Sequence, residues 1–330
     1  MVSTDGPCHL LLETRFQITF RLNYSSKLKK SNLNIKYILS MDGGGVRTLA
    51  SITFLKHLEK EIGIATHEKF DFFIGTSAGA ISCLALSLKK FSATELEQMW
   101  SIENLNRSMN TSSWESRLGL LQPNPKYSSE GKREVLGDYF GNALLKDVAK
   151  PVAVLSYDIE QRSPVLLRSY DEETHNISLV DAGDATSAAP IYYPTAKVEN
   201  RYLIDGAIVA NHPVLHGYVE AKKLYPDTEF KVMSIGTGLS KRPLRGEASK
   251  NWGIVGWMMH DLFGLMVESS LDHELAGDLI GKDYLRVNSA LNGVNRRLDD
   301  KSESNLKKII KMGDSWWDKF GEKAVKLLTS

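Results

Sequence analysis

Short apolar runs alternate with stretches of helical periodicity along most of this sequence. The runs 37–41 and 70–74 have the length of buried strands, and between them apolar residues recur every three or four positions from Leu49 to Ile62. The segment 78–88 is apolar on every side, which predicts a buried helix. Further strands are predicted at 152–158, 165–169, 202–204 and 230–235. Strands that alternate with helices predict an α/β fold, with a largely parallel sheet covered on both faces.

The two ends of the chain have patterns of their own. Apolar and polar residues alternate from Phe16 to Tyr24, and a polar, lysine-rich stretch follows up to Asn34. We therefore assign residues 1–34 to an N-terminal extension, either an added hairpin or a disordered segment, and 35–330 to one domain. Near the C-terminus the periodicity predicts an amphipathic helix with a break at Gly313.

Composition excludes several classes of protein. Hydrophobic residues make up 42% and charged residues 25%, which is ordinary for a globular protein. The formal net charge is +1, so no basic field favours a nucleic acid partner. Two cysteines give no disulfide framework and favour a reducing compartment. The longest uncharged run, 72–88, contains glycines and serines that fit strand, turn and helix better than a membrane span. We expect a cytoplasmic protein, with membrane contact at most peripheral.

The segment Gly75-Thr76-Ser77-Ala78-Gly79 matches G-x-S-x-G between a predicted strand and a predicted helix. That setting is typical of a nucleophile elbow, in which a sharp turn exposes the serine and its neighbours must be small. The N-terminus of the following helix would direct backbone N–H groups toward the serine oxygen. The pattern makes Ser77 the candidate nucleophile; an ordinary strand–helix turn is the alternative.

A glycine-rich loop, Asp42-Gly43-Gly44-Gly45-Val46-Arg47, also follows a predicted strand. Consecutive glycines let several backbone N–H groups converge on one anion, either a phosphate or the oxyanion of an acyl intermediate. The spacing fits neither nucleotide-binding glycine motif. Arg47 adds a positive charge for an anion or substrate, and a flexible turn with a solvated arginine is the alternative.

Asp205 follows the predicted strand 202–204 and is a candidate base. Carboxyl ends of strands converge on one crevice in an α/β sheet, so Asp205 and Ser77 could meet there. A histidine base would be expected after the aspartate. His212 and His216 follow Asp205 too closely to fit that role well.

The three motifs together resemble the patatin-like phospholipases, and flanking segments such as 125–128 and 186–190 are similar as well. The resemblance covers about 35–330 and implies a three-layer α/β/α sandwich. It implies a serine lipid acyl hydrolase of phospholipase A type, acting on phospholipids or galactolipids. In that family a serine and an aspartate form a dyad without histidine, which makes Ser77 the nucleophile and Asp205 the base. Gly43, Gly44 and Gly45 would form the oxyanion hole, together with the N–H of Ala78.

The resemblance implies no cofactor, and the sequence has no calcium-loop or zinc spacing. A membrane lipid is the expected partner, while a homodimer and a small-molecule activator stay open. The chain departs from the family pattern at Thr48, where glycine is common, and at His212, which could place an imidazole near the dyad. Two other functions stay open: a non-catalytic storage or binding protein on the same fold, and a soluble esterase or thioesterase with a histidine base.

The segment from Trp252 to Met266 is the richest in tryptophan and methionine. It is either a lid that dips into lipid or a core helix, because tryptophan and methionine stripes also serve packing.

Overall fold

The structure of the protein is a computed structural model. It describes residues 34–88, 91–110, 124–241, 243–244, 246–253, 256–257, 264–265 and 272–330. Contacts divide the chain into two units, Met1–Leu33 and Asn34–Ser330. The predicted N-terminal extension, apart from Asn34, lies outside the described residues.

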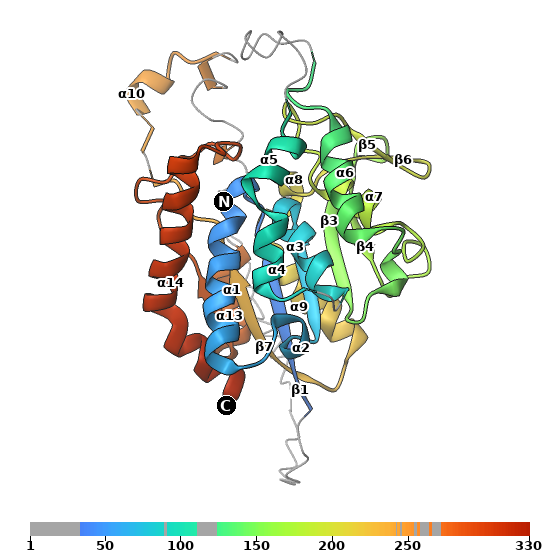
Figure 1. The fold of residues 1–330 in the computed structure, drawn as a ribbon, viewed down its shortest axis with the longest axis vertical. Coiled ribbons are helices and arrows are strands. Elements are labelled where there is room, and N and C mark those ends of the chain that lie inside the picture. The colour runs from blue at the N-terminus through green and yellow to red at the C-terminus, as the bar shows by residue number, and fades with distance from the viewer. Residues whose placement is uncertain are drawn as a thin grey trace, which may run out of the picture. The chain divides into compact units, whose positions relative to one another are not determined.

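A mixed sheet of eight strands forms the centre of the described part of the chain, in the order β5-β6-β3-β2-β1-β7-β8, with β4 paired to β3 (Figure 1). The strands are β1 (Ile35–Met41), β2 (Phe72–Thr76), β3 (Val152–Asp158), β4 (Ser163–Arg168), β5 (Ala196–Val198), β6 (Arg201–Asp205), β7 (Glu229–Ile235) and β8 (Tyr284–Val287). β1 pairs in parallel with β2 and β7, and the pairs β2–β3 and β7–β8 are parallel as well. The strands β4, β5 and β6 add antiparallel pairs beside β3.

Helices cover both faces of this sheet, so the central strands are apolar on both sides. The helices are α1 (Thr48–Ile62), α2 (Thr66–Lys69), α3 (Ser77–Ser87), α4 (Ala93–Met99), α5 (Ile102–Ser108), α6 (Ser129–Phe140), α7 (Leu179–Thr186), α8 (Ala207–Ala210), α9 (Val214–Leu224), α10 (Gly246–Ser249), α13 (Asp272–Ile280) and α14 (Glu303–Thr329). The buried hydrophobic residues form two clusters. Leu39 and Met41 of β1 pack in one cluster with α1, α3 and α14, whereas Ile38 packs in the other with α9 and α13. This alternation explains why the strand is a continuous apolar run. The three-layer α/β/α fold expected from the sequence is confirmed.

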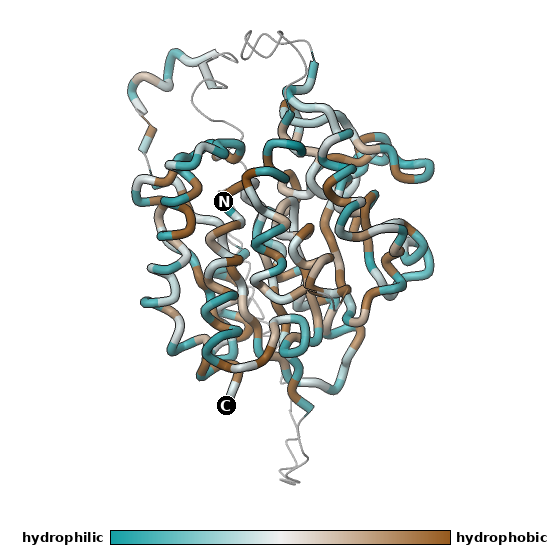
Figure 2. Tube along the Cα trace, viewed as in Figure 1, coloured by the Kyte–Doolittle hydropathy of each residue, from teal (hydrophilic) through white to brown (hydrophobic). Residues whose placement is uncertain are grey.

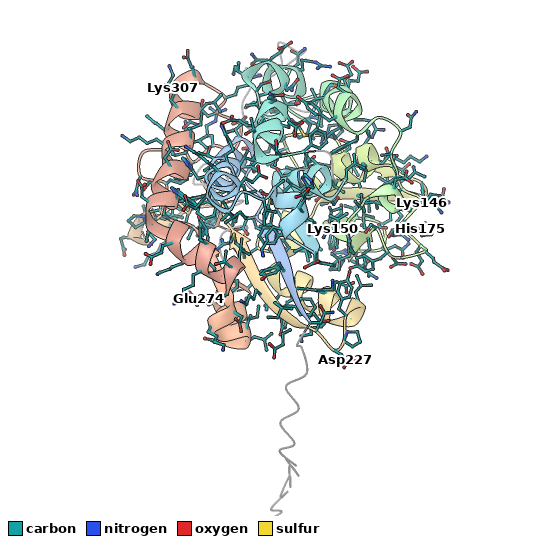
Figure 3. All side chains as sticks on the ribbon, turned by 60° about the horizontal axis from the view of Figure 1, so that its bottom comes forward. Lys146, Lys150, His175, Asp227, Glu274 and Lys307 are labelled. Carbon is teal, nitrogen blue, oxygen red and sulfur yellow. The ribbon has the colours of Figure 1, made fainter. Side chains whose placement is uncertain are left out.

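The surface of the described part is polar. In Figure 2 hydrophobic positions follow the central strands, and hydrophilic positions dominate the outer helices and loops. Figure 3 shows charged side chains such as Lys146, Asp227 and Glu274 at the periphery. In the described residues no helix combines the length and the apolar character needed to cross a bilayer.

Helix α14 corrects one sequence expectation, because it runs unbroken through Gly313. A Cβ at Gly313 would lie 2.6 Å from the carbonyl oxygen of Ala50 and 2.6 Å from Cβ of Thr53. At this glycine α14 therefore packs closely against α1, and the predicted break is wrong. Close packing, rather than a helix end, requires the missing side chain.

Candidate active site

Ser77 lies at the sharp turn between β2 and α3. Its φ of +55° is in the left-handed region, which L-residues adopt mainly where the surrounding structure enforces it. The neighbouring glycines allow the tight packing: a Cβ at Gly75 would lie 2.5 Å from Cα of Ala80, and one at Gly79 would lie 2.4 Å from the carbonyl oxygen of Asp42. The segment 75–79 thus has the strand–turn–helix geometry of a nucleophile elbow.

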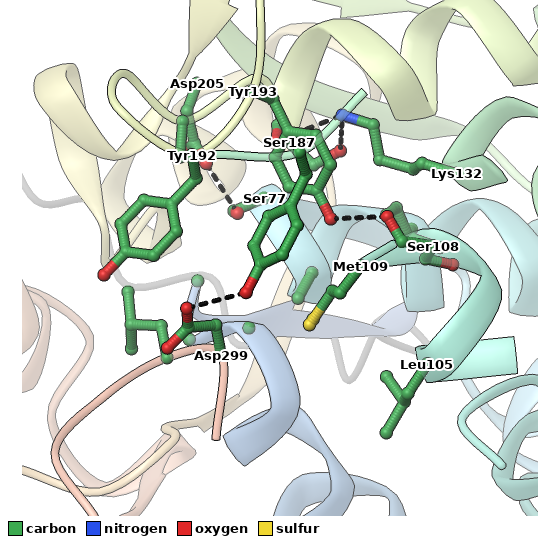
Figure 4. Close-up of a pocket in the computed structure, with 18 of the residues that line it drawn as sticks. Ser77, Leu105, Ser108, Met109, Lys132, Ser187, Tyr192, Tyr193, Asp205 and Asp299 are labelled. Carbon is green, nitrogen blue, oxygen red and sulfur yellow. Dashed lines mark hydrogen bonds between the residues drawn. The ribbon is translucent and has the colours of Figure 1, made fainter. Parts of the chain in front are cut away.

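Ser77 and Asp205 are in direct contact. Ser77 Oγ donates a hydrogen bond of 2.7 Å to Asp205 Oδ2, and the Ala207 N–H donates to Asp205 Oδ1 at 2.9 Å (Figure 4). Asp205 is only 2% exposed. Burial raises the pKa of Asp205 to about 6, against the opposing effects of the Ser77 hydroxyl, the Ala207 N–H and the charge of Lys132.

The route by which Asp205 reaches Ser77 differs from the expected one. β6 is antiparallel to β3, and its last residue, Asp205, pairs with Ser156. The residue before Ser156, Leu155, pairs with Thr76, the residue before Ser77. The carboxyl end of β6 therefore points back into the sheet, at the level of Ser77. Asp205 meets Ser77 because β6 enters from beyond the ends of the parallel strands and stops level with them.

The segment 186–188, at the C-terminal end of α7, contacts both members of this pair. The Ser77 N–H donates to Thr186 Oγ1 at 3.0 Å, and the Asp205 N–H donates to the carbonyl oxygen of Ala188 at 3.1 Å. The Thr186 hydroxyl itself donates to the carbonyl of Leu155 in β3. Sequence reasoning assigned no role to this segment, which stood out only as one of the stretches similar to the patatin-like family.

The peptide between Gly43 and Gly44 is held from one side. The Gly43 carbonyl accepts hydrogen bonds from Thr237 Oγ1 at 2.8 Å and from Asn211 Nδ2 at 3.2 Å. In a trans peptide the next N–H points the opposite way, so these two contacts fix the direction of the Gly44 N–H. The Gly43 N–H, in contrast, donates to the carbonyl of Asn211.

Three further N–H groups are available near Ser77. Gly44, Gly45 and Ala78 all line the pocket that contains Ser77, and among the described residues their N–H groups have no acceptor. A Cβ at Gly45 would lie 2.2 Å from the carbonyl oxygen of Leu298, and its φ is +55°, so this position requires glycine. The expected oxyanion loop is thus next to Ser77, with the Gly43 N–H already engaged.

Asp42 is buried in a charged cluster of its own. Arg286 Nη1 donates to Asp42 Oδ1 at 2.9 Å, and His212 Nδ1 lies 2.6 Å from Asp42 Oδ2. Burial alone would raise the pKa of Asp42, but Arg286 and His212 outweigh it and lower the pKa to about 2. His212 is therefore engaged with Asp42 rather than with Ser77 or Asp205. Sequence patterns gave no signal for Arg286, which comes from β8.

A pocket opens beside Ser77 with a volume of about 1000 Å³, counting its open mouth. Its walls are mostly apolar and come from α3, α4, α5 and α6, which suits a ligand with a hydrocarbon part. Figure 4 shows Ser77 and Asp205 on one side of this pocket and Leu105 and Met109 on the other. The larger apolar side chains of the pocket include Ile81, Met99, Trp100, Leu105, Met109, Val135, Leu136 and Leu298.

Polar groups also line the pocket. Tyr127 Oη donates to Asp299 Oδ2 at 2.8 Å, and Lys126 forms an ion pair with the same carboxylate. Arg47 is buried and lines the same pocket, and its role toward substrate stays a prediction. In the described residues no group of three or more histidine, cysteine or acidic side chains could hold a metal ion.

Much of the predicted lid, 252–266, lies outside the described residues. Trp252 and Trp257 are described, and their rings meet edge to face with centroids 5.3 Å apart. Both indoles are half-buried. Whether the segment is a lid or a core helix stays a prediction.

Comparison with solved structures finds two bacterial proteins, VipD and ExoU. VipD from Legionella pneumophila has a TM-score of 0.48 and 11% identity, with 89% of this chain and 66% of VipD covered. ExoU, in its complex with SpcU from Pseudomonas aeruginosa, has a TM-score of 0.43 and 12% identity. That match covers 90% of this chain and 52% of the ExoU chain.

Sequence comparison is more specific. A protein from Pseudomonas aeruginosa described as a cGAMP-activated phospholipase is 31% identical over 288 residues, with 84% of this chain and 82% of the relative covered. Patatin-like protein 1 of Arabidopsis thaliana is 28% identical, with 84% and 80% covered. The family model described as patatin-like phospholipase matches residues 39–217. These matches confirm the expected enzyme class, a lipid ester hydrolase. The chain belongs to the patatin-like phospholipase family.

Proposed function

We propose that this chain is a serine lipid acyl hydrolase of phospholipase A type, which cleaves fatty-acyl esters of membrane phospholipids or galactolipids. One observation carries the proposal: the hydrogen bond from Ser77 to the buried carboxylate of Asp205 lies at the wall of an apolar pocket. A hydroxyl held by a base beside a space for hydrocarbon is the arrangement that acyl transfer from a lipid ester requires.

In the first step Asp205 accepts the proton of the Ser77 hydroxyl as its oxygen attacks the ester carbonyl. The carboxylate must be ionised to do so, and its raised pKa of about 6 makes it a stronger base than an ordinary aspartate. The left-handed backbone at Ser77 presents the hydroxyl at the tip of the turn. Protonated Asp205 then gives this proton to the ester oxygen, the bond between that oxygen and the carbonyl carbon breaks, and the acyl group stays on Ser77.

The N–H groups of Gly44, Gly45 and Ala78 would stabilise the negative charge on the tetrahedral oxygen. Gly43 was expected to contribute too, but its N–H is engaged by Asn211, so its carbonyl contacts would instead orient the Gly44 N–H. Each such donor typically contributes about 2.7–4 kcal/mol to transition-state stabilisation.

Deacylation uses the same groups in reverse roles. Asp205 takes a proton from a water molecule, the hydroxide attacks the acyl carbonyl, and the fatty acid leaves as Ser77 regains its proton. The pocket beside Ser77 would hold the acyl chain through both steps. The contact of His212 with Asp42 favours this dyad over a hydrolase that uses His212 as base.

The test is mass spectrometry of the products released from mixed membrane lipids. Wild type should release free fatty acids and lysolipids, and Ser77→Ala should release neither. A fluorophosphonate should label wild type on Ser77. Turnover by pure Ser77→Ala at a rate near that of wild type would overturn the proposal.

Ser82→Ala is a matched control. Ser82 is a buried serine of the same helix whose hydroxyl donates to the carbonyl of Ala78, and it does not line the pocket. This variant should hydrolyse lipid at close to the wild-type rate, which separates loss of the nucleophile from damage to α3.

A relative of this chain is described as a cGAMP-activated phospholipase, so cGAMP is a candidate activator of this chain too. The test is hydrolysis of lipid vesicles and of a short-chain monomeric ester, each with and without cGAMP. Activation on both substrates would identify a switch at the site itself, whereas activation on vesicles alone would identify control of membrane contact. Size-exclusion chromatography under the same conditions tests the homodimer.

A further inference from the structure

We propose that Lys132 is a positioning residue of this reaction, which holds the segment 186–188 that fixes Ser77 against Asp205 and directs its positive charge toward the dyad. The proposal rests on the proposed hydrolase function. Sequence reasoning gave Lys132 no role.

Lys132 is instead one of the most buried charges of the described chain. It extends from α6 into the wall of the active-site pocket, and only 5% of it is exposed. Its Nζ donates to Ser187 Oγ at 3.1 Å and to the carbonyl of Ser187 at 3.3 Å. It also lies 2.9 Å from Asp184 Oδ1 (Figure 4 shows the lysine beside Ser187).

The position of Ser187 makes these contacts relevant to the dyad. The residue before it, Thr186, accepts the N–H of Ser77, and the residue after it, Ala188, accepts the N–H of Asp205. Ser187 therefore lies between the two backbone contacts that set the spacing of nucleophile and base. Because Lys132 binds both its hydroxyl and its carbonyl, the lysine restrains the whole segment.

Lys132 does not have its carboxylate partner to itself. Asp184 is shared with Arg133, whose Nη1 lies 3.1 Å from Asp184 Oδ2, and Arg133 also binds Asp181. Besides these groups, Lys132 faces Asp205 and the ring of Tyr193, 4.0 Å from Nζ.

These charges act in opposite directions on the two titrating groups. Burial lowers the pKa of Lys132, while Asp184 and Asp205 favour its charged form. For Asp205, burial raises the pKa and the charge of Lys132 partly offsets the rise, together with the Ser77 hydroxyl and the Ala207 N–H. Removal of the lysine charge should therefore leave Asp205 protonated up to a higher pH.

The experiment compares Lys132→Met with wild type on a monomeric ester over pH 4–9. Wild-type kcat/KM should rise with pH through about 6. In Lys132→Met this acid limb should move to higher pH, kcat above the limb should fall about tenfold or more, and KM should change little. Fluorophosphonate labelling of Ser77 should slow in parallel. Lys132→Arg, which keeps the charge, should leave the acid limb near its wild-type position even where kcat is lower.

Arg133→Met is the matched control. Arg133 binds the same carboxylate from the solvent side and does not line the pocket, and among the described residues it makes no hydrogen bond to Ser187. Its kcat and acid limb should stay close to wild type. If Lys132→Met folds poorly, Lys132→Met/Asp184→Asn removes the orphaned carboxylate, and kcat should still fall relative to Asp184→Asn alone.

Two results would overturn the proposal. An acid limb and kcat unchanged in folded Lys132→Met would make the lysine merely structural, and a raised KM with unchanged kcat would make it a substrate contact. Failure of the proposed function is distinguishable from both, because it appears in the Ser77→Ala comparison, where wild type and variant would then hydrolyse lipid equally.

Discussion

Asp42 and Asp205 are both buried aspartates at the ends of strands, yet their surroundings give them opposite properties. Arg286 and His212 bind Asp42 and hold its pKa near 2. Among the described residues, the Asp205 carboxylate accepts hydrogen bonds from only one hydroxyl and one N–H, with the Lys132 charge beyond them, and burial raises its pKa to about 6. The same side chain is thus a permanent anion in one place and a group able to take up a proton in the other.

The difference shows what each carboxylate contributes. A fully paired carboxylate is stable as an anion and has little tendency to accept a proton, so Asp42 serves to join β1, β8 and the segment that carries His212. A buried carboxylate with few partners is destabilised in its charged form, so taking up a proton is favourable for it. That property is the one a general base requires.

The largest expected effect is on catalysis by Asp205→Asn. The amide keeps the size of the side chain but cannot take up the Ser77 proton, so kcat should fall by at least about 10³-fold. Hydrolysis of a short-chain chromogenic ester measures it. Asp158→Asn, which alters another buried strand-end aspartate away from the pocket, should retain kcat. Comparable losses in both variants would contradict a specific role for Asp205.

The next largest effect is on stability, in Asp42→Asn. The change leaves the buried Arg286 guanidinium without its carboxylate, which should lower the free energy of unfolding by about 3–5 kcal/mol. Urea titration monitored by circular dichroism measures the loss. Asp42→Asn/Arg286→Met should recover much of it, because no buried charge is then left unpaired. An unchanged urea midpoint in the single variant would show that the pair adds little.

Asp205→Asn should also change stability, in the opposite direction to Asp42→Asn. The folded-state pKa of Asp205 is raised from 3.8 to about 6, so its favourable contribution to stability is present below pH 3.8 and is lost as pH rises through 6. Removal of the charge should therefore stabilise the protein at pH 8 by up to about 3 kcal/mol, and by much less at pH 4. Melting temperatures at the two pH values test this, and equal shifts at both would contradict it.

The smallest effect on kcat is expected when the glycine loop 43–45 loses a support. Thr237→Val removes one hydrogen-bond donor to the Gly43 carbonyl at nearly constant volume. The Gly44 N–H is then held less firmly, which should raise the activation free energy by about 1 kcal/mol and lower kcat about fivefold. Steady-state kinetics at pH 8 measure it. Thr53→Val removes a buried hydroxyl that binds the Leu49 carbonyl within α1, and should leave kcat unchanged.

The family was recognised from the resemblance of three short motifs. The α/β fold and the strands at the centre of the sheet were predicted from the sequence pattern, because buried parallel strands are continuous apolar runs. The contact of Ser77 with Asp205 was anticipated, but for a reason the antiparallel β6 overturns. Local motifs carry the glycines and the serine, whose backbone requirements are local too. The direction of a strand depends on pairing with residues far along the chain and leaves no local mark.

The partners of the site were not predictable for the same reason. Arg286 and Lys132 come from β8 and α6, far from the motifs, and each is ordinary in its own segment. Gly313 was misread because a glycine that permits close helix contact and one that ends a helix look alike in sequence. What such residues do depends on the tertiary contacts they make.

The position of β1 in the sheet has a consequence for synthesis of the chain. β1 lies between β2 and β7, and its register with β7 joins residues about 190 positions apart. A growing chain that has only reached Ser77 therefore lacks β7, the second strand that pairs with β1, and it also lacks Asp205, which lies 128 residues further on. Such long-range pairing is slow to form, so the nascent chain carries Ser77 without Asp205, its proposed base, until most of the sheet has been made. If the two residues act as proposed, the membranes of the producing cell meet the complete pair only after translation is well advanced.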